Sequence, residues 1–273
     1  MANTSLVKLD NIYLKREDQN PTGSAKDRAI PLQIEHLKNQ GYQQAVISST
    51  GNAAISAAHF CHQHQIKLTI FLSPKINPHK LNLLKNYEAE IIISPQPISD
   101  SIKFSKTNSA YLLRQSTDPV AQIGYQQISL ELTEQLPQIS SLFIPIGSGT
   151  TLLGISQKLP PQVKIFGCQS VANSPISQIF DTNFTPETRL ITDALSAKFL
   201  PNKNEIIKTI KKFNGSAFSL QNEAIISAHD YLKRLGITTS LEGALSFAAY
   251  KKAVENNFSV GDFPVILLTG AER

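Results

Sequence analysis

Short apolar runs alternate with amphipathic stretches along most of the chain. The runs have the length of buried strands, and the stretches between them carry apolar residues at helical spacing. The predicted strands are residues 12–15, 45–49, 68–72, 91–94, 141–146, 163–168 and 264–268. The predicted helices include residues 52–64, 119–135, 221–235 and 241–256. This alternation favours an α/β fold with mainly parallel strands and helices on both faces of each sheet.

The length of 273 residues is enough for one large domain or two smaller lobes, each with its own core. We expect two lobes, with boundaries near residues 44 and 122. One further helix is predicted near Lys26, where Pro31 falls inside the helical stretch. Because proline lacks a backbone N–H and crowds the preceding turn, this helix is expected to start late or to bend.

The composition, 41% hydrophobic and 17% charged residues, is typical of a globular protein. No apolar run reaches the roughly 18 residues of a membrane span, and no secretory signal is evident at the N-terminus. The two cysteines, Cys61 and Cys168, are far apart, which predicts reduced thiols and a cytoplasmic location. The net charge of +5 is spread out, and its densest patch, residues 203–212, reads as a solvated helix face. We therefore expect no nucleic-acid partner and no membrane association.

Lys26 stands out because a turn rich in Asn, Pro, Thr and Gly brings it to the start of a predicted helix. A lysine whose pKa is lowered by apolar surroundings is an amine nucleophile that forms a Schiff base with an aldehyde. The alternative interpretation is an ordinary solvated lysine.

A second candidate site follows the predicted strand 141–146. Glycines there let backbone N–H groups approach an anion, hydroxyls add donors, and a helix begins directly afterwards. This loop, called the Gly147 loop below, consists of Gly147, Ser148, Gly149, Thr150 and Thr151. It lacks the Gly-Lys-Ser/Thr of a P-loop, and Leu152 occupies the last glycine position of G-x-G-x-x-G. A small phosphate ester therefore fits better than a nucleotide, unless the loop is a turn that binds nothing.

Two further segments place hydroxyl groups after predicted strands. The Gly51 loop, made of Ser49, Thr50, Gly51 and Asn52, is suited to a substrate carboxylate, although an ordinary helix N-cap explains it as well. Thr269 follows the last strand, at the edge where open α/β sheets usually bind ligands. A plain strand end followed by a turn glycine is the alternative for Thr269.

Together these segments resemble the fold-type II pyridoxal-phosphate enzymes, which include threonine synthase, threonine and serine dehydratases, cysteine synthase and the tryptophan synthase β subunit. The resemblance covers nearly the whole chain. Residues 4–7 are similar to the family's entry segment, and residues 20–28 (Asn-Pro-Thr-Gly-Ser-Ala-Lys-Asp-Arg) to its Schiff-base lysine motif. The Gly51 loop, the Gly147 loop and residues 268–270 resemble three further family segments in the family's order.

The resemblance implies a tryptophan synthase β-like fold of two open parallel-sheet lobes. Residues 1–44 and 123–273 would form the large cofactor-binding lobe, and residues 45–122 a smaller mobile lobe. Pyridoxal 5'-phosphate would be the cofactor, a small amino acid the substrate, and a homodimer the assembly. No metal is expected.

The resemblance also implies a role for each site residue. Lys26 would hold the cofactor and act as the catalytic base, and Asn52 would bind the cofactor's phenolic oxygen. Ser49, Thr50, Gly51 and Gln115 would bind the substrate. The Gly147 loop would bind the cofactor phosphate, and Thr269 would lie at the pyridine nitrogen. A hydroxyl there, in place of a carboxylate, favours elimination or replacement over transamination.

The subgroup stays open. The lysine motif and the Gly51 loop are most similar to threonine synthase, whereas the Gly147 loop, residues 194–201 and residues 270–273 are similar to cysteine synthase. Residues 120–124 lack the arginine with which threonine synthases usually grip a phosphate. Two rivals are a catalytically silent partner subunit that binds the cofactor, and a metal enzyme built on His59, Cys61, His62 and His64.

Overall fold

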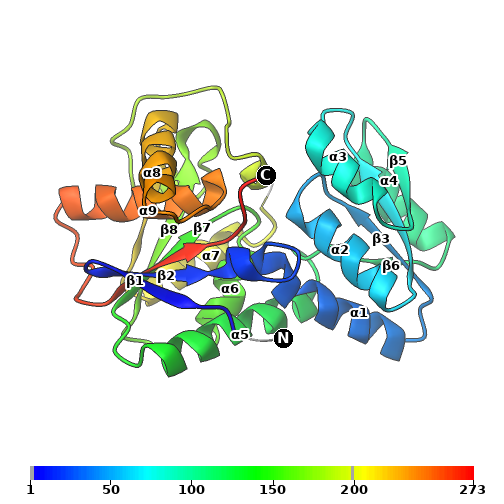
Figure 1. Cartoon of the computed structure of the whole chain (residues 1–273), viewed down its shortest axis with the longest axis horizontal. Helices are drawn as coiled ribbons and strands as arrows, with labels where there is room; N and C mark the ends of the chain where they lie inside the picture. Colours follow the sequence, from blue (N-terminus) through cyan, green and yellow to red (C-terminus); the bar gives the residue numbers. More distant parts are fainter. Residues whose placement is uncertain (1–2, 198–199) are drawn as a thin grey trace. The chain divides into compact units, whose positions relative to one another are not determined.

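The computed structural model describes residues 3–197 and 200–273, which fold into two compact units (Figure 1). The first unit comprises the residues up to Ala25 together with Tyr125–Glu272. The second unit comprises Lys26–Gly124 together with Arg273. One of the divisions, between Gly124 and Tyr125, falls inside helix α5 (Pro119–Gln135).

The sheet of the first unit has the strand order β1-β2-β10-β7-β8-β9. Its antiparallel edge pair is β1 (Leu6–Leu9) with β2 (Ile12–Arg16). The remaining strands pair in parallel: β10 (Pro264–Leu268), β7 (Ser141–Pro145), β8 (Lys164–Ser170) and β9 (Ser216–Leu220). Every residue of β7, β9 and β10 is buried, as expected for parallel strands covered on both faces.

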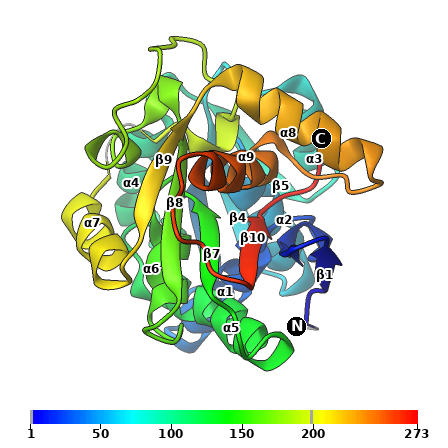
Figure 2. The same cartoon turned by 90° about the vertical axis from the view of Figure 1, so that its left-hand side faces the viewer.

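Helices pack on both sides of this sheet (Figure 2). On one side, α8 (Asn222–Arg234) and α9 (Leu241–Glu255) cover a core in which the rings of Phe143 and Phe166 stack with centroids 4.7 Å apart. Because side chains alternate along a strand, the neighbouring Leu142 and Ile144 face the other side, where they are also fully buried. The helices on that side include α6 (Thr150–Ser156) and α7 (Lys203–Lys212).

The sheet of the second unit has the order β5-β4-β3-β6 and is parallel throughout. Its strands are β5 (Ala89–Ile93), β4 (Lys67–Leu72), β3 (Gln44–Ser48) and β6 (Tyr111–Leu112). Ala45 and Ile47 pack with α1 (Ile30–Asn39) and α2 (Asn52–Gln63), beside α3 (Pro78–Lys85). Val46 faces the opposite side, toward α4 (Pro97–Thr107).

The predicted fold class is confirmed, because both sheets have parallel strands with helices on both faces. The predicted strands and helices all appear with small changes at their ends, whereas β1, β6 and β9 were not predicted. After Lys26 the chain makes a 3-10 turn (Ala25–Arg28), and α1 begins at Ile30 with Pro31 in its first turn. The helix therefore starts late, one of the two predicted outcomes. The mobile lobe of residues 45–122 stays a prediction.

Candidate active site

Lys26 lies in the 3-10 turn Ala25–Arg28 and is half-buried. The preceding segment makes a tight turn in which the Gly23 N–H donates to the Asn20 carbonyl over 2.7 Å. Gly23 has a φ of 73°, a left-handed conformation that other residues rarely adopt. After the lysine, the Ala29 N–H donates to the Lys26 carbonyl over 3.1 Å. The backbone is thus fixed on both sides of the lysine.

A buried polar network anchors the start of this turn. The Asn20 amide donates to one carboxylate oxygen of Glu17, and the Thr4 hydroxyl donates to the other, both over 2.7 Å. Close by, the Lys15 ammonium lies 2.6 Å from the Glu131 carboxylate, and both side chains are 1% exposed or less. Buried charges of this kind persist only when they are paired or hydrogen-bonded. Because Asn20 donates to the buried Glu17 carboxylate, the network fixes the position of Asn20.

The end of the turn is tied to the last strand of the first unit. The Ala25 N–H donates to the Thr269 carbonyl over 3.0 Å, and the Ala271 N–H donates to the Gly23 carbonyl over 2.8 Å. Ser24 and Gly270 form an isolated β-bridge between these segments. The residue directly before the predicted catalytic lysine is therefore bound to the residue predicted to face the pyridine nitrogen.

The Gly147 loop follows β7 and leads into α6. Gly149 has a φ of 83° and caps α6 without any side-chain hydrogen bond, so no capping side chain occupies the first-turn N–H groups of the helix. A Cβ on Gly149 would lie 2.1 Å from Cδ1 of Ile206. The hydroxyl oxygens of Ser148 and Thr150 lie 2.9 Å apart, and Thr151 is half-buried. Glycine backbone and paired hydroxyls form a donor set that suits phosphate oxygens.

Strand pairing brings Thr269 to the same edge of the sheet as this loop. Strand β10 pairs in parallel with β7, with Ile266 opposite Phe143. Since the carboxyl ends of neighbouring parallel strands meet at one edge, Thr269 and the Gly147 loop both extend from that edge. The structure thus brings together the residues predicted for the phosphate and the pyridine nitrogen.

The Gly51 loop occupies the corresponding edge of the second unit. It follows β3 and leads into α2, and its four residues are all half-buried. The Ser49 hydroxyl oxygen accepts the Gly51 N–H over 3.2 Å. Gln115, which is 9% exposed, follows β6, the parallel neighbour of β3. The predicted substrate residues Ser49, Thr50, Gly51 and Gln115 therefore share one sheet edge.

A second polar group holds the chain around Gln115. One carboxylate oxygen of Asp118 accepts the Tyr111 hydroxyl over 2.7 Å and the Gln33 amide over 2.6 Å. Burial, reinforced by the hydrogen bond to Asp118, raises the pKa of Tyr111 well above its ordinary value. Tyr111 therefore stays a neutral donor to Asp118, and Asp118 ties this segment to α1 by accepting from Gln33.

One polar contact of the Gly51 loop was not predicted. The Arg273 guanidinium Nη1 donates to Oδ1 of Asn52 over 3.0 Å. The two residues are 221 positions apart, and although residues 270–273 resemble cysteine synthase, the sequence assigns Arg273 no role. No local pattern could have identified this pair.

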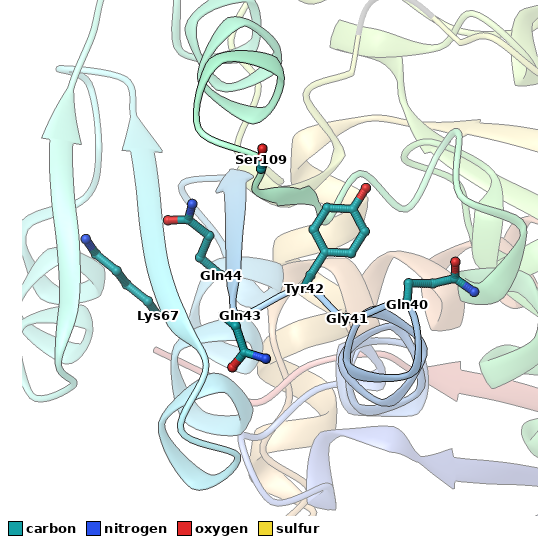
Figure 3. A pocket seen from close by; sticks show the side chains of 7 residues that line it. All are labelled: Gln40, Gly41, Tyr42, Gln43, Gln44, Lys67 and Ser109. Carbon is teal, nitrogen blue, oxygen red and sulfur yellow. The ribbon is translucent and has the colours of Figure 1, made fainter.

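A pocket of about 550 Å³ lies at the opposite edge of the second sheet (Figure 3). It surrounds the amino ends of β3 and β4 and contains no predicted site residue. Ligands of open α/β sheets bind outside the carboxyl ends of the strands, so this pocket is not the candidate site. Its lining residues are Gln40, Gly41, Tyr42, Gln43, Gln44, Lys67 and Ser109.

The proposed metal ligands on α2 do not converge. Cys61 is buried in the core, His62 is exposed, and His59 packs edge-on against Phe60 and Tyr87. Across residues 3–197 and 200–273, no group of three or more His, Cys, Asp or Glu side chains is placed to hold a metal ion. None of the helices in this described part of the chain combines the length and apolar character needed to cross a membrane.

The family model described as "Pyridoxal-phosphate dependent enzyme" matches residues 1–270. The chain belongs to this family. The match confirms three predictions from the sequence: the family, the enzymatic function and pyridoxal phosphate as the cofactor. Among related proteins, the chain is 25% identical to threonine synthase of Methanosarcina acetivorans, over 96% of this chain and 70% of that protein.

Threonine dehydratases are similar as well. The catabolic L-threonine dehydratase of Staphylococcus aureus is 26% identical over 94% of this chain and 78% of its own length. The biosynthetic L-threonine dehydratase of Haemophilus influenzae is 22% identical over 96% of this chain, which spans about half (53%) of that enzyme. The solved structure of maize serine racemase superposes with a TM-score of 0.88 at 20% identity, covering 100% of this chain and 89% of its own, which shows a shared fold.

The residues present fit the cofactor of this family. A phosphate needs several N–H and O–H donors, which the Gly147 loop carries without a competing side-chain cap. An aldehyde needs an amine, which Lys26 supplies from a turn fixed on both sides. The Gly147 loop thus suits the phosphate of pyridoxal phosphate, and Lys26 suits its aldehyde.

Proposed function

We propose that this enzyme catalyses elimination or replacement on a small L-amino acid with a β- or γ-leaving group, of the serine or threonine type. The observation that carries this proposal is a threonine, rather than an acidic residue, beside the Gly147 loop at the carboxyl edge of β10 and β7. When bound, pyridoxal phosphate takes up the electrons that remain at Cα after its proton is removed.

The chain's own residues divide the work. The Lys26 amine would hold the cofactor through its aldehyde carbon, and the same amine would be the base that removes the Cα proton of the substrate. Gly147, Ser148, Gly149, Thr150 and Thr151 hold the phosphate, and Asn52 donates a hydrogen bond to the phenolic oxygen. Ser49, Thr50, Gly51 and Gln115 bind the substrate carboxylate. Holding the cofactor and the substrate in fixed positions in this way lowers the entropic cost of proton removal.

Thr269 sets the outcome of the reaction. Its hydroxyl is neutral and cannot stabilise a protonated pyridine nitrogen as an aspartate would. Negative charge at Cα is then poorly delocalised, and prompt loss of the leaving group is favoured over transamination. A cysteine synthase-like replacement is the second candidate, favoured by Gln115 at the carboxyl edge of β6 beside the Gly51 loop.

A substrate screen tests the proposal. The protein loaded with pyridoxal phosphate is offered L-serine, L-threonine, O-acetyl-L-serine and O-phospho-L-homoserine, and oxo acid and ammonia are measured. Elimination should release both from at least one of them, whereas replacement should consume the amino acid and release its leaving group without oxo acid or ammonia. Cysteine formation on adding sulfide would favour the second candidate. Lys26→Ala should abolish turnover, whereas Lys38→Ala, an exposed lysine of the same unit, should not.

Two results would contradict the proposal. Transamination as the main reaction with an added oxo acid would exclude the role given to Thr269. Cofactor binding without consumption of any of these amino acids would instead favour a catalytically silent partner subunit. A homodimer and a cytoplasmic location belong to the same proposal, and sedimentation of the loaded protein tests the former.

A further inference from the structure

The side chain of Asn52 has a defined orientation because of the residue that it meets. A guanidinium group carries N–H donors and has no acceptor, so the amide atom that faces Arg273 at 3.0 Å must be the carbonyl oxygen. The assignment of oxygen and nitrogen, which is often ambiguous for asparagine, is therefore fixed by chemistry. Because Arg273 occupies Oδ1, the Nδ2 group is the part of the Asn52 side chain that can donate to another molecule.

Arg273 remains charged in this setting. Partial burial of the guanidinium lowers its pKa, while the nearby Asp27 and Tyr87 raise it. An arginine stays protonated far above neutral pH, so the donor to Oδ1 is permanent. The hydrogen bond also polarises the Asn52 amide, which strengthens its Nδ2–H groups as donors.

From this geometry we infer that Arg273 is a positioning residue, which turns the Asn52 amide so that Nδ2 donates to the phenolic oxygen of pyridoxal phosphate. The inference rests on the proposed function, since it takes the role of Asn52 from there. Without the arginine, the Asn52 amide can rotate and turn its carbonyl oxygen toward the phenolic oxygen, and two acceptor oxygens repel each other. The phenolic oxygen of the bound cofactor would then lose a hydrogen-bond donor and would hold a proton more tightly.

The test follows the visible absorption of the protein loaded with pyridoxal phosphate as a function of pH. In Arg273→Met, we expect part of the visible band to move to shorter wavelength and its pH midpoint to rise by roughly half to one unit. Arg273→Lys, which keeps a charged donor, should recover part of the shift. Substrate turnover is not needed for this measurement.

Two variants separate positioning from a general loss of structure. Lys233→Met removes the pair of 2.7 Å between Lys233 and Glu272, the residue next to Arg273, and should leave the band and midpoint unchanged. In an Asn52→Ala background, Arg273→Met should cause no further shift, because the two residues act through one hydrogen bond.

The possible outcomes distinguish this inference from the proposed function. If the unmodified protein shows no visible band with the cofactor, the proposed function fails. If the band is present but Arg273→Met leaves its wavelength and midpoint unchanged, the positioning role is wrong. An equal shift with Asn52 already replaced, or an equal shift in Lys233→Met, would also overturn it.

Discussion

The Gly147 loop and the Gly51 loop have the same place in their units, each between a parallel strand and a helix, but they are built differently. An added Cβ at Gly149 meets Ile206 at 2.1 Å, and Thr150 is 1% exposed. An added Cβ at Gly51 has nothing within 4 Å, and all four residues of its loop are half-buried. The loop assigned to the cofactor is thus set by core packing, whereas the loop assigned to the substrate keeps room to adjust.

The largest expected effect comes from Gly149→Ala. A left-handed backbone costs a residue with a side chain about 1–2 kcal/mol, and the contact with Ile206 adds overpacking of about 1–3 kcal/mol. We expect the free energy of unfolding, measured with urea, to fall by about 2–5 kcal/mol, and cofactor affinity to fall at least about tenfold.

Gly51→Ala is the matched control for this comparison. Gly51 has φ −124° and ψ −153°, which alanine adopts without strain. Its free energy of unfolding should change by less than about 0.5 kcal/mol. Equal losses of stability in the two variants would contradict the difference between the loops.

A smaller effect is expected from Ser49→Ala. The change removes a hydroxyl assigned to the substrate carboxylate, and a hydrogen bond contributes about 1 kcal/mol, so KM should rise several-fold. The dissociation constant of the cofactor should stay the same. Ser73→Ala is the control, because Ser73 also directly follows a strand and accepts the N–H two residues on, over 3.3 Å. A changed cofactor affinity in Ser49→Ala would contradict the separation of roles.

Thiol labelling at pH 8 compares the two units of the unmodified protein, without any substitution. Burial raises the pKa of Cys61 to about 12, and it also raises the pKa of Cys168. A pKa above the labelling pH keeps each thiol protonated, so Cys61 should react about 10³-fold more slowly than after unfolding in urea, and Cys168 should be slowed as well. Cys61 lies on α2, the helix that follows the Gly51 loop, whereas Cys168 lies on β8. Cys61 should therefore react before Cys168. Faster labelling of Cys168 would contradict this order.

Much of this molecule follows from local patterns in the sequence. Strands such as β4 and β7 were predicted because burial on both faces makes them continuous apolar runs. Strand β9 was not predicted, because Ser216 and Ser219 interrupt its apolar pattern, although both are buried by neighbours distant in sequence. Strand β6 has only two residues and owes its existence to pairing with β3.

The candidate site shows the same division. Each loop carries its chemistry in a few consecutive residues, so its position in the chain could be predicted. The pairs Asn52 with Arg273 and Lys15 with Glu131 join residues more than a hundred positions apart. Only the folded chain brings them together, and no spacing rule in a single sequence could have indicated them.

The central claim is that the Lys26 amine holds the cofactor. The most direct measurement is reduction of the pyridoxal-phosphate-loaded protein with borohydride, followed by proteolysis and mass spectrometry. The account predicts one phosphopyridoxyl group per chain, on the peptide that contains Lys26, and none in Lys26→Ala. Attachment to another lysine, or an unchanged yield in Lys26→Ala, would contradict it.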